Sequence, residues 1–201
     1  MIKNIIFDLG RVLLTFDPEG FIESKADLAP HKDFLLENVF KNPLWIELDR
    51  GTMSVDEVVQ KISSTYPDLR EVINSCLHDF NEMFNVIESS EKILYDLKEQ
   101  GYNLYILSNF HVESYDYVTS RFNFFKAFDG RIISAYVKQV KPDRGIYETL
   151  LVTFDLKAEE TLFIDDTLAN IEGAAEVGIH GIHLYDPAIL ENALSEFEIA
   201  V

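Results

Sequence analysis

The sequence contains a single cysteine, Cys76, so no disulfide bond can form within the chain. Disulfides belong mainly to oxidising compartments, and a chain without them fits a reducing one. Long hydrophobic runs are also missing. The apolar run at the N-terminus is interrupted by Asp8, and no later stretch approaches the roughly 20 residues of a transmembrane helix. These absences predict a cytoplasmic protein with neither a signal peptide nor a membrane span.

Basic residues are scarce as well. The chain carries 17 Lys and Arg against 35 Asp and Glu, a net charge of -18. So acidic a chain repels nucleic-acid backbones and anionic lipid surfaces, which excludes both as expected partners. With 201 residues, 47% of them hydrophobic, the chain is long enough for one well-packed core with or without an insert.

The first strand is expected at the N-terminus. Ile5, Ile6 and Phe7 form a short apolar run that is typical of a strand buried on both faces, as in parallel sheets. The run ends in Asp8, a residue type depleted in strands. Because open α/β sheets bind ligands at the carboxyl ends of their strands, Asp8 is a candidate site residue. Gly10 then allows a sharp turn and a close approach of the backbone to a ligand.

Residues 16–87 show helical spacing and no strand pattern. Asp17 and Pro18 are typical of a helix N-cap followed by proline at the first helical position. Ser54 and Glu57 have the spacing of a capping box. We therefore expect a small helical cap domain at 16–87, inserted after the first strand, with the catalytic core formed by 1–15 and 88–201.

From residue 88 onward, strand and helix patterns alternate. Strands are expected at 103–107, 131–134, 161–164 and 181–185, and helices at 90–100, 111–122, after Pro142 and at 168–177. This alternation predicts an α/β fold with a parallel sheet covered by helices on both faces. Since crossovers are right-handed, every strand should present its carboxyl end at the same edge.

Polar residues follow three of these strands: Asp8, then Ser108 with Asn109, then Asp165 with Asp166. Lys141 lies on a loop that can reach the same edge. Three carboxylates placed together repel one another unless a cation lies between them, and hard oxygen ligands in this number suit Mg²⁺. Asp8 keeps a second oxygen that can attack phosphorus, and Lys141 balances the charge. The set predicts phosphoryl transfer.

Four motifs, in this order along nearly the whole chain, resemble the haloacid dehalogenase superfamily. They are Phe7-Asp8-Leu9-Gly10-Arg11-Val12, Leu107-Ser108-Asn109, Lys141-Pro142-x-x-x-Ile146-Tyr147 and Asp165-Asp166-x-x-x-Asn170-Ile171-x-Gly173-Ala174. Within that superfamily the chain looks most like sugar-phosphate phosphatases of the α-D-glucose-1-phosphate phosphatase type. The resemblance implies a three-layer Rossmann-like core, an aspartyl-phosphate intermediate, Mg²⁺ and a small phosphorylated metabolite as substrate.

The resemblance also implies residue roles. Asp8 would be the nucleophile and Lys141 the charge-stabilising base, while Ser108 would bind the phosphate together with Asn109 and Arg11. The metal ligands would be Asp8, the carbonyl of Gly10, Asp166 and the adjacent Asp165, with Asn170 as a support behind them. The protein is expected to be a monomer or a homodimer.

One position departs from the family pattern. Phosphatases of this superfamily usually carry a second aspartate two residues after the nucleophile, which protonates the leaving oxygen and later activates water. Here that position is Gly10. The carbonyl ligand is retained, but the acid and base is lost. Without it the rate should depend steeply on the acidity of the leaving group.

Other interpretations stay open at this point. A 2-haloacid dehalogenase also attacks through aspartate without the second one, and a catalytically weakened protein could bind a phosphorylated ligand without turnover. His111 is expected to have a capping or surface role, with a position in the pocket wall as the alternative. Trp45 is expected to pack in the core of the insert, with a position over the ligand as the alternative.

Overall fold

The computed structural model describes all residues from 1 to 201. Its centre is one sheet of five parallel strands in the order β3-β2-β1-β4-β5. The strands are β1 (Asn4–Phe7), β2 (Asn103–Ser108), β3 (Gly130–Ile133), β4 (Thr161–Asp165) and β5 (His180–His183). The α/β fold with a parallel sheet, predicted from the alternating pattern, is confirmed. No helix is both long and apolar enough to cross a bilayer.

The first strand lies in the middle of the sheet. Phe7 is paired with Ile106 of β2 on one side and with Ile164 of β4 on the other. This register brings the carboxyl ends of the three strands to one edge, with Asp165, the last residue of β4, level with Asp8, and Ser108, the last residue of β2, one position further along. Asp8, Ser108 and Asp165 therefore meet there because their strands are neighbours in register.

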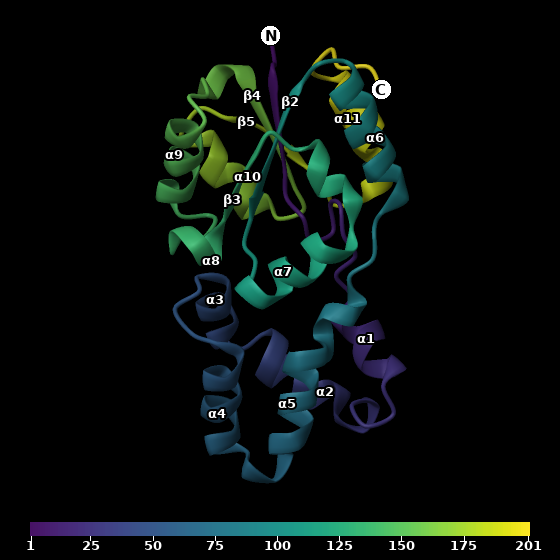
Figure 1. The fold of residues 1–201 in the computed structure, drawn as a ribbon, viewed down its shortest axis with the longest axis vertical. Helices are drawn as coiled ribbons and strands as arrows, with labels where there is room; N and C mark the ends of the chain where they lie inside the picture. The colour runs from purple at the N-terminus through teal and green to yellow at the C-terminus, as the bar shows by residue number, and fades with distance from the viewer.

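Helices cover both faces of the sheet (Figure 1). One face packs against α6 (Glu88–Glu99), α7 (Val112–Arg121) and α11 (Leu190–Ser195), and the other against α9 (Arg144–Thr153) and α10 (Leu168–Ala175). Alternate residues of β1 serve the two layers. Ile5 and Phe7 belong to the larger apolar cluster and Ile6 to the smaller one, as expected for a strand buried on both faces.

Between β1 and α6 the chain forms only helices and turns. The helices are α1 (Pro18–Ser24), α2 (Lys32–Leu35), α3 (Leu44–Asp49), α4 (Val55–Thr65) and α5 (Arg70–Asp79). The expected N-caps are present at Asp17 and in the Ser54–Glu57 capping box. In Figure 1 this cap lies below the sheet, beyond the carboxyl ends of the strands. The exact domain boundaries stay a prediction.

Two adjacent connections join the cap to the rest of the chain. The N–H of Thr15 donates to the carbonyl of Asn85 at 2.8 Å, and the N–H of Ile87 donates to the carbonyl of Leu13 at 2.9 Å. Leu14 and Val86 form an antiparallel bridge between them. The chain therefore enters and leaves the cap at one point, through two paired segments.

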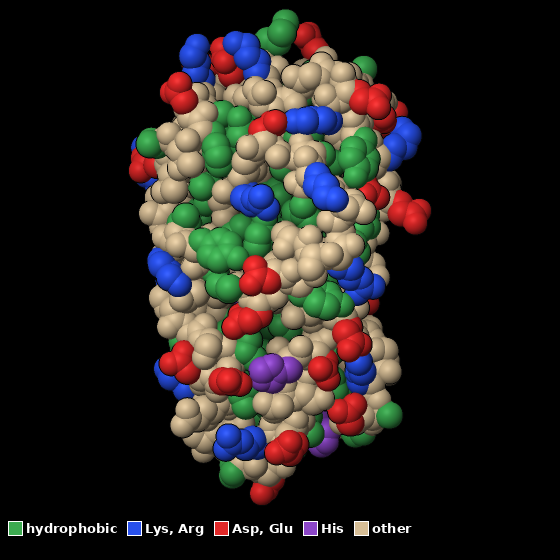
Figure 2. Space-filling view, in the orientation of Figure 1, with side chains coloured by type: hydrophobic (Ala, Val, Ile, Leu, Met, Phe, Trp, Pro, Cys, Tyr) green, Lys and Arg blue, Asp and Glu red, His purple; other side chains and the backbone are tan.

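Short elements complete the chain. They are α8 (Ser134–Val137), a π-helical turn η2 (Leu36–Phe40), and the 3-10 turns η1 (Ala29–His31), η3 (Pro67–Leu69), η4 (Phe80–Met83), η5 (Asn123–Ala127), η6 (Ala158–Glu160) and η7 (Pro187–Ile189). The sequence patterns did not predict α8 or α11, because helices of four and six residues show too little periodicity. On the face that Figure 2 shows, Lys and Arg side chains are scattered among acidic ones and form no continuous patch.

Candidate active site

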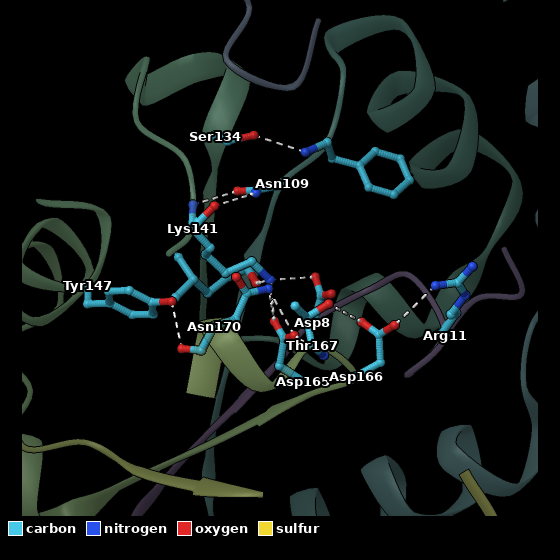
Figure 3. Close-up of polar contacts among 12 residues, drawn as sticks. Asp8, Arg11, Asn109, Ser134, Lys141, Tyr147, Asp165, Asp166, Thr167 and Asn170 are labelled. Carbon is cyan, nitrogen blue, oxygen red and sulfur yellow. Dashed lines mark hydrogen bonds and ion pairs between the residues drawn. The ribbon is translucent and has the colours of Figure 1, made fainter. Parts of the chain in front are cut away.

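A buried lysine connects the carboxylates that follow β1 and β4. The ammonium of Lys141 donates to Asp165 Oδ2 at 2.6 Å and to the carbonyl of Leu107 at 3.0 Å (Figure 3). Its Nζ also lies 3.0 Å from Asp8 Oδ1. The geometry of this last contact is that of an ion pair without a proper hydrogen bond, so Asp8 Oδ1 is buried with no donor. The Lys141 ammonium thus pairs with two carboxylates, with a hydrogen bond to Asp165 and only an ion-pair contact to Asp8.

Asp165 is fully engaged by the protein. Its Oδ1 accepts from the backbone N–H of Thr167 at 2.8 Å and from Asn170 Nδ2 at 3.0 Å, while Oδ2 accepts from Lys141. The side chain is completely buried. Asp165 therefore orients its neighbours and has little capacity left for a ligand.

Asp166 is much less constrained. Its Oδ2 lies 3.5 Å from a guanidinium nitrogen of Arg11, and its Oδ1 accepts from the Thr167 hydroxyl at 3.3 Å. His183 Nε2 contacts the backbone carbonyl of Asp166 at 3.0 Å, a contact that the sequence did not indicate. The backbone is thus held in place while the carboxylate remains available to a ligand.

Burial and charge shift the acidities at this edge. Burial, partly offset by Lys141 and reinforced by Asp165, raises the pKa of Asp8 from 3.8 to about 7. Burial alone would lower the pKa of Lys141, but the Asp165 and Asp8 carboxylates outweigh it, and the pKa is raised. Burial and Asp165 also raise the pKa of Asp166. The protein alone does not neutralise its own carboxylates here.

The donors at this edge fit a divalent cation. Carboxylate oxygens of Asp8, Asp165 and Asp166 lie within 4.8 Å of one another. Asp8 Oδ1 lacks a donor, and no group of the protein donates to the carbonyl of Gly10. Oxygen ligands, excess negative charge and a buried carboxylate oxygen that accepts no hydrogen bond together match the requirements of Mg²⁺.

The raised pKa of Asp8 predicts a pH dependence of stability in the metal-free protein. The folded state binds the Asp8 proton more tightly than the unfolded state, so the free energy of unfolding should fall as pH rises from about 4 to about 7. The loss due to Asp8 should be at most about 4 kcal/mol. Urea unfolding with a chelator at several pH values measures it. The free energy of unfolding of the Asp8→Asn variant should change less with pH than that of the wild type. Equal changes in both proteins would contradict the raised pKa of Asp8.

Asn109 fixes the loop that carries Lys141. Its Oδ1 accepts from the backbone N–H of Lys141 at 2.9 Å, and its Nδ2 donates to the Lys141 carbonyl at 3.0 Å. The loop also touches α10 at Gly173, where an added Cβ would lie only 2.7 Å from the Pro142 carbonyl oxygen. Gly173 is thus required for this close approach. The Asn109 amide, expected to bind substrate, is used to position Lys141.

A pocket of about 630 Å³, measured out to the open solvent, lies between this edge and the cap. Its polar end is formed by Asp8, Gly10, Arg11, Ser108, Asn109, Asp166 and Thr167. Ser108 lines the pocket together with Asp8, and Arg11 lies beside Asp166. The rest of its wall is largely aromatic, with Phe16, Trp45, Phe80, Phe84 and Phe110, and also contains Asp49, His111 and Ser114. The sequence did not indicate this aromatic wall, although it left a position over the ligand open for Trp45.

His111 lines the same pocket, and its expected capping or surface role is wrong. The residue is 3% exposed, and its side chain does not cap α7. Its Nε2 lies 3.0 Å from Asp49 Oδ1, at the end of α3 in the cap. Sequence reasoning missed Asp49. A carboxylate in the last turn of a helix interacts unfavourably with the helix dipole. This unfavourable position was the feature of the sequence that could have marked Asp49 as a candidate site residue.

Comparisons with known proteins agree with the fold. A family model described as haloacid dehalogenase-like hydrolase matches residues 35–184. A sesquiterpene phosphatase of Aspergillus oryzae is 29% identical over 92% of this chain and 90% of its own. A D-ribitol-5-phosphate phosphatase of Bacteroides thetaiotaomicron is 27% identical over 89% of both. A HAD-family enzyme of Bacteroides thetaiotaomicron, solved with magnesium and inorganic phosphate, superimposes with a TM-score of 0.74 at 24% identity, covering 90% of this chain and 93% of that one.

Proposed function

Because the chain belongs to the haloacid dehalogenase-like hydrolase family, we propose that it is a Mg²⁺-dependent phosphatase that acts on a small phosphomonoester through Asp8. The observation that carries the proposal is the environment of Asp8. This nucleophile follows the central strand, keeps one carboxylate oxygen without a donor, and lies between Lys141 and the acidic pair. The phosphatases among the similar proteins support the same reaction class.

The reaction divides among residues of the polar end of the pocket. An oxygen of Asp8 attacks phosphorus, the bond from phosphorus to the leaving oxygen breaks, and the phosphoryl group is carried on Asp8. Lys141 favours the ionised form of Asp8 and faces the phosphoryl oxygens, while Ser108 donates to them. Arg11 lines the entrance to this end and attracts the dianion. Positioning and charge compensation of this kind supply most of the catalysis in phosphoryl transfer.

We assign the metal ligands to Asp8, Asp166 and the carbonyl of Gly10. When bound, Mg²⁺ neutralises charge on the phosphoryl group and holds it in place. The sequence predicted that Asp165 also binds the metal. In the structure both Asp165 oxygens accept hydrogen bonds from Thr167, Lys141 or Asn170, so we propose that Asp165 instead orients the lysine.

The aromatic wall supports a substrate with a largely apolar carbon skeleton. Sugar hydroxyls would meet few partners in this part of the wall, because its polar side chains are only Asp49, His111 and Ser114, against five aromatic rings. The sesquiterpene phosphatase relative agrees with an apolar alcohol, whereas the ribitol-phosphate relative favours the sugar phosphate that the sequence suggested. We propose an apolar phosphomonoester first and a sugar or polyol phosphate second.

The two alternative functions are less compatible with the site. A haloacid dehalogenase must accept a carboxylate substrate beside Asp8, and the poorly compensated Asp166 carboxylate would repel it. A purely binding protein would have no use for a nucleophile oriented by a buried lysine. Both alternatives remain distinguishable by experiment.

The test is a substrate panel with and without Mg²⁺. It compares geranyl phosphate, ribitol 5-phosphate, glucose 1-phosphate and 2-chloropropionate as substrates of the same preparation. We expect Mg²⁺-dependent phosphate release, fastest from geranyl phosphate. Chloride release that a chelator does not affect would support the dehalogenase, and phosphate binding without turnover of any ester would support the binding protein.

Removal of Asp166 should weaken the metal site. In Asp166→Ala we expect the Mg²⁺ affinity to fall at least about tenfold, because a direct carboxylate ligand is lost. Isothermal titration calorimetry with Mg²⁺ alone measures the affinity without any substrate. The exposed Asp68 in the cap provides a matched control, and Asp68→Ala should bind Mg²⁺ like the wild type. Unchanged affinity in Asp166→Ala would refute the assignment.

A further inference from the structure

The cap brings a carboxylate to the pocket where the catalytic loop lacks one. Gly10, two residues after Asp8, offers no side chain to protonate the leaving oxygen. Asp49, the last residue of α3, lines the same pocket together with Asp8 and Gly10. The pocket therefore contains an acidic group besides Asp8 and Asp166, and this group comes from the cap.

The two oxygens of Asp49 have different surroundings. Oδ1 lies 3.0 Å from His111 Nε2, whereas Oδ2 has no hydrogen-bond partner in the protein. The side chain keeps 12% of its exposure, at the pocket that it lines. One oxygen thus contacts the imidazole while the other remains available to a bound molecule.

The surroundings of His111 leave it one polar neighbour, Asp49. Its ring lies against Trp45 at 4.8 Å and Phe80 at 5.4 Å between centroids, and its Nδ1 is buried without a partner. Asp49 is consequently the one polar partner of the ring. Such a pair is neutral when it carries a transferable proton and has a charge of -1 after giving it up.

The end of α3 is fixed to the core beside β2. The Ser134 hydroxyl donates to the carbonyl of Asp49 at 2.5 Å and accepts from the N–H of Phe110 at 2.9 Å. The Lys138 ammonium donates to the carbonyl of Gly51. Figure 1 shows α3 directly beneath α8, and Figure 3 shows Ser134 on the same side of the site as Asn109. These bonds fix the backbone of Asp49 at the wall of the pocket, and proton transfer needs a group held in a fixed position.

We infer that Asp49, positioned by His111, is the general acid and base of the reaction and replaces the side chain missing at Gly10. The inference rests on the proposed phosphatase function. In the first step Asp8 bonds to phosphorus, the bond to the leaving oxygen breaks, and that oxygen takes the proton of the Asp49–His111 pair. In the second step water gives a proton back to the pair, its oxygen bonds to phosphorus, and the bond from phosphorus to Asp8 breaks. Phosphate leaves and the pair is restored.

The test compares two esters by rapid kinetics in the Mg²⁺-loaded enzyme. The 4-nitrophenolate group is stable enough to leave without a proton, whereas an alkoxide must be protonated as it leaves. In Asp49→Asn we expect the first step to slow by about 10²–10⁴-fold with an alkyl phosphate and by less than about tenfold with 4-nitrophenyl phosphate. Since water activation is also lost, 4-nitrophenol should appear as a burst followed by slow turnover.

Two further variants separate chemistry from structure. Glu47→Gln, in the same helix but outside the pocket wall, should keep wild-type rates. Gly10→Asp can be tolerated, because a Cβ on Gly10 meets no atom within 4 Å and its backbone is not left-handed. In the Asp49→Asn background, Gly10→Asp should raise the rate with the alkyl phosphate at least about tenfold. If Asp49→Asn only damaged the structure, adding Gly10→Asp would not restore this rate.

A second route keeps the inference testable if Asp49→Asn does not fold. His111→Gln retains a donor for Asp49 but cannot hold the proton, so it should also slow the alkyl ester more than the aryl ester. Equal slowing of both esters, or no slowing, would overturn the inference while leaving the phosphatase function intact. If the wild type hydrolyses neither ester, the proposed function fails and this inference fails with it.

Discussion

Asp8→Asn should reduce phosphatase turnover on the order of 10⁶-fold, the scale seen when a catalytic nucleophile is removed. The amide has nearly the same size, so the contacts of β1 with β2 and β4 should persist. It cannot attack phosphorus, and it offers a weaker ligand to Mg²⁺ than a carboxylate. Phosphate release from the best ester in the panel measures the loss.

Stability measurements provide the control for this variant. Asp8 carries a raised pKa, which means that its charge is unfavourable in the metal-free fold at pH 8. Asp8→Asn should therefore be more stable than the wild type in the presence of a chelator, although it is inactive. Retention of most of the wild-type rate would exclude Asp8 as the nucleophile, and a loss of stability would contradict the electrostatic account.

Lys141→Met should destabilise the metal-free protein by about 3–5 kcal/mol at neutral pH. The change removes the one ammonium between Asp8 and Asp165 and leaves two buried carboxylates facing each other. Methionine fills the space but supplies no charge, so turnover should also be lost. Urea unfolding with a chelator measures the stability difference.

The exposed Lys157, whose side chain pairs with Glu160 at 3.6 Å, is the matched control for Lys141. Lys157→Met should change the free energy of unfolding by less than about 1 kcal/mol, as expected for a surface ion pair. Combining Asp8→Asn with Lys141→Met should recover part of the lost stability, because one of the facing charges is gone. If Lys141→Met were as mild as Lys157→Met, the buried charge network would have no energetic role.

The sequence was informative where local rules determine position. Asp8, Ser108 and Asp165 each lie at the carboxyl end of a short apolar strand, and parallel strands in register must present their ends together. The caps at Asp17 and Ser54 were likewise readable, because they depend on residues within one turn. The strand ends, and the starts of those helices that were predicted, therefore agree with the structure to within about two residues.

The functions of individual side chains near the strand ends were harder to predict. Spacing alone could not show that Asn109 bonds to the backbone of Lys141, since the two are 32 positions apart. It also could not separate Asp165 from Asp166, because adjacent residues differ only in the direction in which their side chains point. That difference comes from Thr167 and Asn170, which bind Asp165 and leave Asp166 available.

The cap contribution was not predictable from local patterns. Asp49 and His111 are separated by 62 positions and meet only because α3 packs against the loop after β2. The aromatic wall has the same origin, since helical periodicity marks Phe80 as buried without telling which surface it covers. Docking of the cap on the core creates this half of the pocket.

The paired connections at Leu13–Thr15 and Asn85–Ile87 attach the cap at one side of the pocket, while the bonds of Asp49 and Gly51 hold it at the other. A cap attached in this way opens by rotating about the paired connections once the bonds of Asp49 and Gly51 break. Opening would carry Asp49 away from Asp8, and closure would bring it back. The proton donor would then belong to the moving cap and the nucleophile to the core. An ester bound to the open form would contact Asp8 without Asp49.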